Sequence, residues 1–188
     1  MFRRPSIDTS LCEYKVTNNI FDDNNPHAPT TQIYDWLYLG NISDANNISK
    51  NTQQQQNQNQ NHNDIENNDE NDNYKCIISC CKDKINHEPN IKYIQYPIDD
   101  LNDENIENIF YEFSDTLEEL EKTHTKTLVH CVMGISRSPT LIMAFLIIKK
   151  HMTFTEAYDF VLSLRPIINV NLGFFLKLEQ LGNDCMNN

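Results

Sequence analysis

The spacing of apolar residues along the chain predicts an alternation of strands and helices. Four short runs rich in apolar and β-branched residues are typical of buried strands, and they cover 33–39, 75–80, 91–96 and 127–130. Five other segments have features of helices, and they cover 41–49, 106–120, 138–150, 153–165 and 174–181. Such an alternation predicts an α/β fold, in which a central, mainly parallel sheet of four or five strands is flanked by helices on both faces.

Residues at the ends of the predicted helices indicate where several of them begin and end. Ser138 followed by Pro139 predicts an N-cap and a first helical turn. The helix that they open is apolar almost all round, so we expect it at the centre of the core. Thr153 and Glu156 form a capping-box pattern for the next helix, and Gly182 is expected to end the last one.

Two segments lack this periodicity and are predicted to be disordered. Residues 1–30 contain three prolines and are expected to form an extended tail. From 51 to 63, eleven of thirteen residues are Asn or Gln, and 64–74 adds five acidic residues. Such a segment buries too little apolar surface to offset its ordering entropy, so we expect a disordered insertion over 51–73 within a domain over 31–184. A polar tract that binds a partner or self-associates is the alternative.

The charge of the chain excludes some classes of partner. The net charge is −12, which argues against nucleic-acid binding and against docking on an anionic membrane. The longest apolar run, 141–148, is too short to span a bilayer, and no secretory signal is visible. The chain is therefore expected in the cytoplasm or the nucleus, with its six cysteines as free thiols and with a monomer as the default state.

A group of cysteines raises the question of a metal site. Cys76, Cys80, Cys81 and His87 lie close in sequence, but no second pair of ligands follows at the spacing of a zinc site. The cysteines also fall in or beside a predicted buried strand, where cysteine behaves as a small apolar residue. Structural cysteines and no bound metal are therefore favoured over a metalloprotein.

The candidate chemistry lies in the loop between the strand 127–130 and the helix that follows. Backbone amides of a loop that enters a helix form a cradle for an anion, and the same donors favour the thiolate of Cys131. Gly134 permits a tight turn, and Arg137 can hold two oxygens of a tetrahedral phosphate. The alternative is that Cys131 is a core cysteine and that Arg137 is a surface cation. The buried elements on both sides of the loop favour phosphoryl transfer to sulfur.

Residues 130–138, His-Cys-Val-Met-Gly-Ile-Ser-Arg-Ser, resemble the signature loop of protein tyrosine phosphatases, in the form of the dual-specificity branch. The resemblance covers nearly all of 33–181 and is to an atypical, stand-alone member with the three-layer phosphatase fold. It implies a cysteinyl-phosphate on Cys131, stabilisation of the leaving thiolate by Ser138, a brace for the loop at Asn171, and no cofactor. The residues that it places around the bound phosphoryl group are Val132, Met133, Gly134, Ile135, Ser136 and Arg137.

Phosphoryl transfer also needs a proton donor for the departing oxygen. By the resemblance, an aspartate after the strand 91–96 serves as this acid, and the Pro-Ile-x-Asp spacing favours Asp100. Asp99 remains a second choice, and both could be solvated loop acids. His130 lies in a strand, facing away from the nucleophile, so we expect it to support the loop through a hydrogen bond rather than to shuttle protons.

The resemblance also suggests a class of substrate. The loop offers no cation besides Arg137, which disfavours inositol lipids, and the acidic chain disfavours RNA ends. Phosphoproteins are the expected substrates, with mitogen-activated kinases among the candidates, and the short domain resembles the branch that accepts phosphotyrosine and phosphoserine or phosphothreonine. A phosphoprotein-binding module without turnover is the alternative function.

Overall fold

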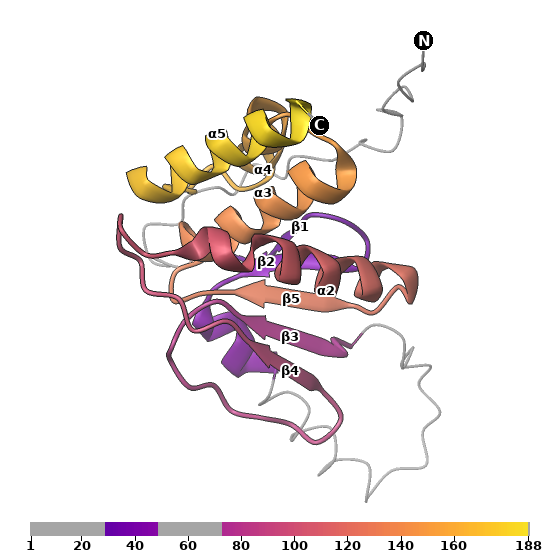
Figure 1. Cartoon of the computed structure of the whole chain (residues 1–188). Helices are drawn as coiled ribbons and strands as arrows, with labels where there is room; N and C mark the ends of the chain where they lie inside the picture. Colours follow the sequence, from indigo (N-terminus) through magenta and orange to yellow (C-terminus); the bar gives the residue numbers. More distant parts are fainter. Residues whose placement is uncertain (1–28, 49–72, 188) are drawn as a thin grey trace, which may run out of the picture.

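The computed structural model describes residues 29–48 and 73–187. The predicted tail over 1–30 and the predicted insertion over 51–73 lie almost wholly outside these residues. Figure 1 shows the described part as a sheet with helices on both of its faces. The predicted α/β fold with a mainly parallel sheet is thus confirmed.

Four parallel strands of the five-stranded sheet end at the same edge, and the loops that follow them gather there. The strands are β1 (Thr31–Gln32), β2 (Leu37–Gly40), β3 (Cys76–Ser79), β4 (Lys92–Gln95) and β5 (Thr127–His130). Their order is β1-β2-β5-β3-β4, and all neighbours are parallel except β1, which runs antiparallel to β2. His130 pairs in register with Gly40 on one side and Ser79 on the other. The loops after β2, β5 and β3 therefore start side by side.

The predicted strand over 33–39 is wrong in its first half. Only Leu37–Gly40 is a strand, because the amides of Ile33 and Tyr34 both donate to the carbonyl of Leu37, at 2.9 and 3.1 Å. The chain therefore turns within this segment. Its apolar residues serve the core instead of a strand, as Trp36 is 3% exposed and packs edge-on against Phe145.

The helices form one thick and one thin layer. They are η3 (Ile106–Ile109), α2 (Phe110–Lys122), α3 (Arg137–Lys150), α4 (Phe154–Leu164) and α5 (Leu172–Asn187), together with a helix over 42–48. The helix over 42–48 contributes Ala45 to a small cluster with Ile77 and Leu128, on the sheet face opposite the main core (Figure 1). On the other face, every residue from 138 to 147 of α3 is buried, as the apolar pattern predicted.

Two predicted helix ends are wrong, and a third is confirmed. Helix α3 begins at Arg137 with Ser136 at its N-cap position, so Ser138 does not cap it. Helix α5 continues through Gly182 to Asn187. A Cβ at Gly182 would lie 2.9 Å from the Cβ of Phe154, so glycine here permits close packing of α5 on α4. The capping box is present, because Glu156 N donates to Thr153 Oγ1 at 3.2 Å and Thr153 N to Glu156 Oε2 at 2.8 Å.

Within the described ranges, none of the helices combines the length and the apolar character that a bilayer-spanning segment requires.

Candidate active site

Cys131 follows directly on β5 and lies at the base of the loop that leads into α3. Its side chain is 1% exposed, and its Sγ accepts hydrogen bonds from Gly134 N and from Ser138 Oγ, each at 3.2 Å. The hydroxyl of Ser138, predicted to cap the helix, is thus directed at sulfur. Two donors and the positive end of the α3 dipole favour the thiolate, which is the nucleophilic form.

Hydrogen bonds from neighbouring segments to two carbonyl groups of the loop hold it from outside. Ile42 N donates to Val132 O at 3.2 Å, and Asn169 N donates to Ile135 O at 2.8 Å. Because the carbonyl and the amide of one peptide point in opposite directions, the amides that follow these carbonyls face the inside of the loop. The loop therefore presents inward-facing donors in addition to the first-turn amides of α3, which have no acceptor within the helix.

Gly134 is required at the bend of this loop. Its φ is +69°, a region that residues with a side chain rarely adopt. A Cβ at this position would also lie 2.3 Å from the carbonyl oxygen of Gly40, at the end of β2. The tight turn predicted from the sequence is therefore present, and it rests on the neighbouring strand.

Arg137, the first residue of α3, supplies a cation beside the loop. Its Nη1 donates to Ile98 O at 3.2 Å, and its Nε lies 3.7 Å from Asp100 Oδ2. The side chain is 13% exposed, and its buried Nε has no hydrogen-bond partner among the described residues. A guanidinium held in this way can bind two oxygens of a tetrahedral anion in the loop.

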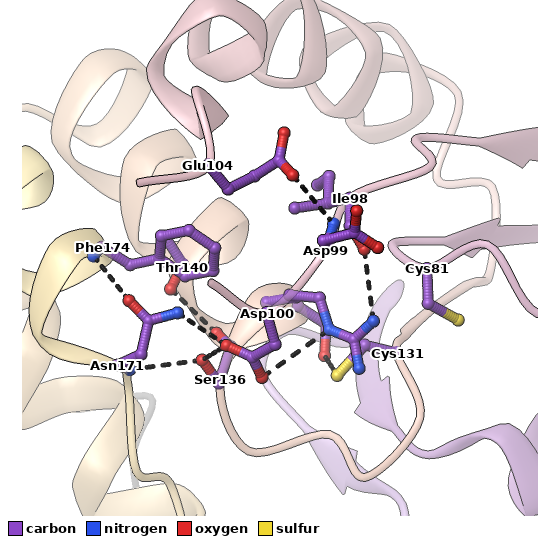
Figure 2. A network of polar contacts seen from close by, with 12 residues as sticks. Cys81, Ile98, Asp99, Asp100, Glu104, Cys131, Ser136, Thr140, Asn171 and Phe174 are labelled. Atoms are coloured by element: carbon purple, nitrogen blue, oxygen red, sulfur yellow. Dashed lines mark hydrogen bonds and ion pairs between the residues drawn. The ribbon is translucent and has the colours of Figure 1, made fainter. Parts of the chain in front are cut away.

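Asp100 is joined to the same loop by a small network of hydrogen bonds. Its Oδ1 accepts from Ser136 Oγ at 2.7 Å and from Asn171 Nδ2 at 2.6 Å, and Figure 2 shows its carboxylate turned toward both. Asn171 also donates its backbone amide to Ser136 Oγ at 3.3 Å. Its Oδ1 accepts from Phe174 N at 2.9 Å, so the start of α5 fixes its orientation. The structure therefore brings the predicted acid and the predicted brace together.

Asp99 lies in a different environment. Its Oδ2 contacts Lys82 Nζ at 2.5 Å, its amide donates to Glu104 Oε2 at 3.3 Å, and its side chain is 43% exposed. These contacts hold Asp99 in an exposed ion pair. Of the two aspartates that the sequence left open, the structure thus directs Asp100 to the loop.

His130 is buried beneath the loop. Its Nδ1 lies 3.1 Å from the carbonyl oxygen of Cys131, and since a carbonyl only accepts, Nδ1 carries the proton. Its Nε2 has no hydrogen-bond partner within the described residues. Burial lowers the pKa of His130, although the bond to Cys131 and the charges of Asp44 and Asp83 act in the opposite direction. This geometry suits the expected support of the loop.

The lowered pKa of His130 gives a testable pH dependence of stability. Because the folded protein binds the proton less tightly than the unfolded chain, whose ordinary pKa is 6.5, acid favours unfolding. We expect the free energy of unfolding to fall as the pH drops below about 6.5, by up to about 1.4 kcal/mol per pH unit from this residue. His130→Asn, which keeps a donor without titrating here, should remove that part of the slope. Urea denaturation of both proteins between pH 5 and 8 tests this, and parallel curves would contradict it.

Sequence reasoning missed one buried residue at the site. Arg165, at the C-cap of α4, donates from Nε to Gly134 O at 2.9 Å and is 2% exposed. Arginine is usually exposed, so although the segment that begins at Arg165 is part of the family resemblance, the sequence did not indicate that this side chain is buried against the loop. The adjacent Pro166 marks only the end of a helix.

Four of the described cysteines lie outside the loop, namely Cys76, Cys80, Cys81 and Cys185. Among the described residues, no group of three or more His, Cys, Asp or Glu side chains could hold a metal ion, and the five cysteines in this part of the chain are free. Cys76, Cys80 and Cys81 are buried, whereas His87 stacks on Tyr93 with 4.0 Å between ring centroids. The metal alternative for this group therefore has no support from the geometry.

Together these groups can perform one kind of chemistry. The sulfur lies at the base of a loop with inward amides, a guanidinium stands beside it, and a carboxyl group is hydrogen-bonded to the loop. An anionic nucleophile, donors for the equatorial oxygens and an acid for the leaving group are the requirements for phosphoryl transfer to sulfur.

Comparisons with known proteins agree with this geometry. The family model described as "Dual specificity phosphatase, catalytic domain" matches residues 28–184. Dual specificity protein phosphatase 1 of Arabidopsis thaliana is 30% identical over 168 residues, which cover 89% of this chain and 74% of that protein. Dual specificity protein phosphatase 14 of Mus musculus is 38% identical over 90 residues, or 48% of this chain and 46% of that protein. The chain thus spans about half the length of some of the curated relatives that it matches.

Solved structures show the same fold. The human tyrosine phosphatase-like serine/threonine/tyrosine-interacting protein is similar with a TM-score of 0.67 and 23% identity, over 84% of this chain and 97% of that one. Human DUSP28 is similar with a TM-score of 0.69 and 17% identity, over 85% and 96% of the two chains. At these identities the likeness concerns the fold alone.

Proposed function

Because the chain belongs to the dual specificity phosphatase catalytic-domain family, we propose that it is a cysteine-dependent protein phosphatase that hydrolyses phosphotyrosine and phosphoserine or phosphothreonine on proteins. The observation that carries this proposal is the pair of hydrogen bonds to Cys131 Sγ, from Gly134 N and Ser138 Oγ. They prepare a nucleophilic sulfur inside an anion-binding loop. Arg137 and Asp100 stand beside the same loop.

In the first step, Cys131 Sγ attacks the phosphorus of the substrate. A sulfur–phosphorus bond forms while the bond from phosphorus to the ester oxygen breaks. The loop amides and Arg137 bind the non-bridging oxygens, on which charge develops. Asp100, close to Arg137 and bonded to Ser136, donates a proton to the departing oxygen.

In the second step, water attacks the phosphorus of the cysteinyl-phosphate. Asp100, now a carboxylate, takes a proton from the water as the sulfur–phosphorus bond breaks. Inorganic phosphate leaves, and the thiolate of Cys131 is restored. Ser138 Oγ, 3.2 Å from Sγ, stabilises the negative charge that returns to sulfur.

The residues at the rim of the loop support the proposal that the substrates are phosphoproteins. Met133 is 61% exposed, and the loop carries a single cation, Arg137, so the site suits one phosphoryl group presented on a protein surface. Mitogen-activated kinases are candidate substrates within this proposal. The free cysteines of the described residues suit the reducing cytoplasm or nucleus, where we place the protein.

Hydrolysis by the purified 188-residue chain tests the proposal. We expect release of phosphate from p-nitrophenyl phosphate and from phosphotyrosine, phosphothreonine and phosphoserine peptides. Turnover should resist a metal chelator and should be inhibited by vanadate, which occupies an anion-binding loop. Binding of phosphopeptides without phosphate release would instead indicate a binding module, and loss of turnover with chelator would indicate a metalloenzyme.

A further inference from the structure

Arg165 is a buried cation that forms no hydrogen bond or ion pair with a carboxylate of the described residues. Its side chain is 2% exposed, and its hydrogen-bond acceptors are oxygens of Gly134, Pro29 and Thr31. Burying a guanidinium is costly unless its charge is compensated. Burial lowers the pKa of Arg165, while the charges of Asp44 and Cys131 oppose that shift. An arginine nevertheless stays protonated in a protein, so a positive charge lies under the loop.

The contacts of Arg165 direct it at the bend of the loop. Its Nε donates to Gly134 O at 2.9 Å, and its Nη2 lies 3.0 Å from the position that a Cβ of Gly134 would occupy. Nη2 is buried and has no hydrogen-bond partner among the described residues. Nη1 donates to Pro29 O at 2.8 Å and to Thr31 Oγ1 at 2.9 Å, so the guanidinium is fixed from the side of β1.

Gly134 links this guanidinium to the sulfur. The amide of Gly134 donates to Cys131 Sγ, while its carbonyl is held by Arg165 Nε. Because the peptide is planar, binding of the carbonyl from outside directs the amide of Ile135 to the inside of the loop. Arg165 thus orients the donors of the loop and adds a positive charge behind them.

We propose that Arg165 is a positioning residue that stabilises the anionic form of Cys131 from behind the loop, opposite Arg137. This inference deepens the proposed function and rests on it. In a site of low dielectric constant, a fixed charge on the far side of one peptide still acts on the sulfur. The buried charge of Arg165 is then compensated by the thiolate together with the carboxylate of Asp44, which acts on it without a direct ion pair.

Five other titratable groups lie near Cys131 or Arg165 and bear on the test: Arg137, Asp100, His130, Cys80 and Asp44. Burial, together with the charge of Cys131, raises the pKa of Cys80 well above its ordinary value, so its thiol stays protonated and does not compete for an alkylating reagent. Cys185 is exposed and would react, so the modification must be assigned to Cys131 by peptide mass spectrometry.

The test is the pH dependence of the alkylation of Cys131 by iodoacetate in four variants of the full chain. Arg165→Lys keeps the charge, Arg165→Gln keeps a donor without the charge, and Arg165→Met keeps neither. Thr31→Val, the control, removes an acceptor of Arg165 and leaves the charge. We expect the midpoint to move up by roughly one pH unit in the Gln and Met variants and to stay near the wild type in the Lys and Val variants.

The outcomes separate this inference from a merely structural role and from the proposed function. The inference is wrong if the alkylation midpoint shifts in proportion to the loss of stability of each variant, whether or not the variant keeps the positive charge. It is also wrong if the midpoint stays unchanged in a folded Arg165→Gln protein. If Arg165→Met does not fold, the comparison of Gln with Lys decides. Alkylation needs no turnover, so a wild-type chain that fails to hydrolyse aryl phosphate would contradict the proposed function and leave this measurement intact.

Discussion

Cys131→Ser is expected to abolish the hydrolysis of aryl phosphate and of phosphopeptides, with a loss of roughly 10⁴-fold or more in kcat. A serine hydroxyl at this position has no adjacent base to remove its proton, whereas the sulfur is favoured as a thiolate by Gly134 N and Ser138 Oγ. Initial rates on p-nitrophenyl phosphate for both proteins at one enzyme concentration measure this loss.

Binding of the anion should survive the same substitution. The loop amides and Arg137 are unchanged, and removal of the negative sulfur lessens repulsion, so inorganic phosphate should bind at least as tightly by calorimetry. Cys185→Ser, which alters the exposed cysteine near the end of α5, is the matched control and should keep the wild-type rate. Turnover that persists in Cys131→Ser would show that Cys131 is not the nucleophile.

Asp100→Asn is expected to lower kcat on phosphothreonine peptides by roughly 10²- to 10³-fold. The asparagine keeps the shape and can still contact Ser136 and Asn171, but it cannot donate a proton to an alkoxide. The loss should be smaller on p-nitrophenyl phosphate, because nitrophenolate leaves without protonation. The ratio of the two losses therefore reports proton donation specifically.

Asp99→Asn is the control for this comparison, since it changes the adjacent residue in the same way. Its carboxylate forms an exposed ion pair with Lys82, and such pairs contribute little to stability. We expect kcat to stay within about twofold of the wild type on both substrates. A larger loss in Asp99→Asn than in Asp100→Asn would reverse the assignment of the acid.

Features that depend on residues close together in the chain were predictable from the sequence. The strand over 127–130 has the predicted bounds, because three apolar or β-branched residues and His130 are all buried at the centre of the sheet. The capping box at Thr153 needs only a neighbour three positions away. The loop after His130 was also identified from the sequence, since its cysteine, glycine and arginine lie within seven residues.

Other features depend on contacts between distant parts of the chain, and only the tertiary structure decided them. The Pro-Ile-x-Asp spacing favoured Asp100 over the adjacent Asp99 only by resemblance, and the contact that distinguishes the two comes from Asn171, 71 positions away. Ser138 fits an N-cap by sequence, yet its hydroxyl is directed at Cys131 because α3 already begins at Arg137. The sequence assigned no role to Arg165, since its partners Pro29 and Thr31 are 136 and 134 positions away. Local spacing thus predicted the candidate nucleophile and the fold class. The side chains that surround its sulfur depend on which strand and helix ends meet at the carboxyl edge of the sheet, and only the tertiary structure decides this.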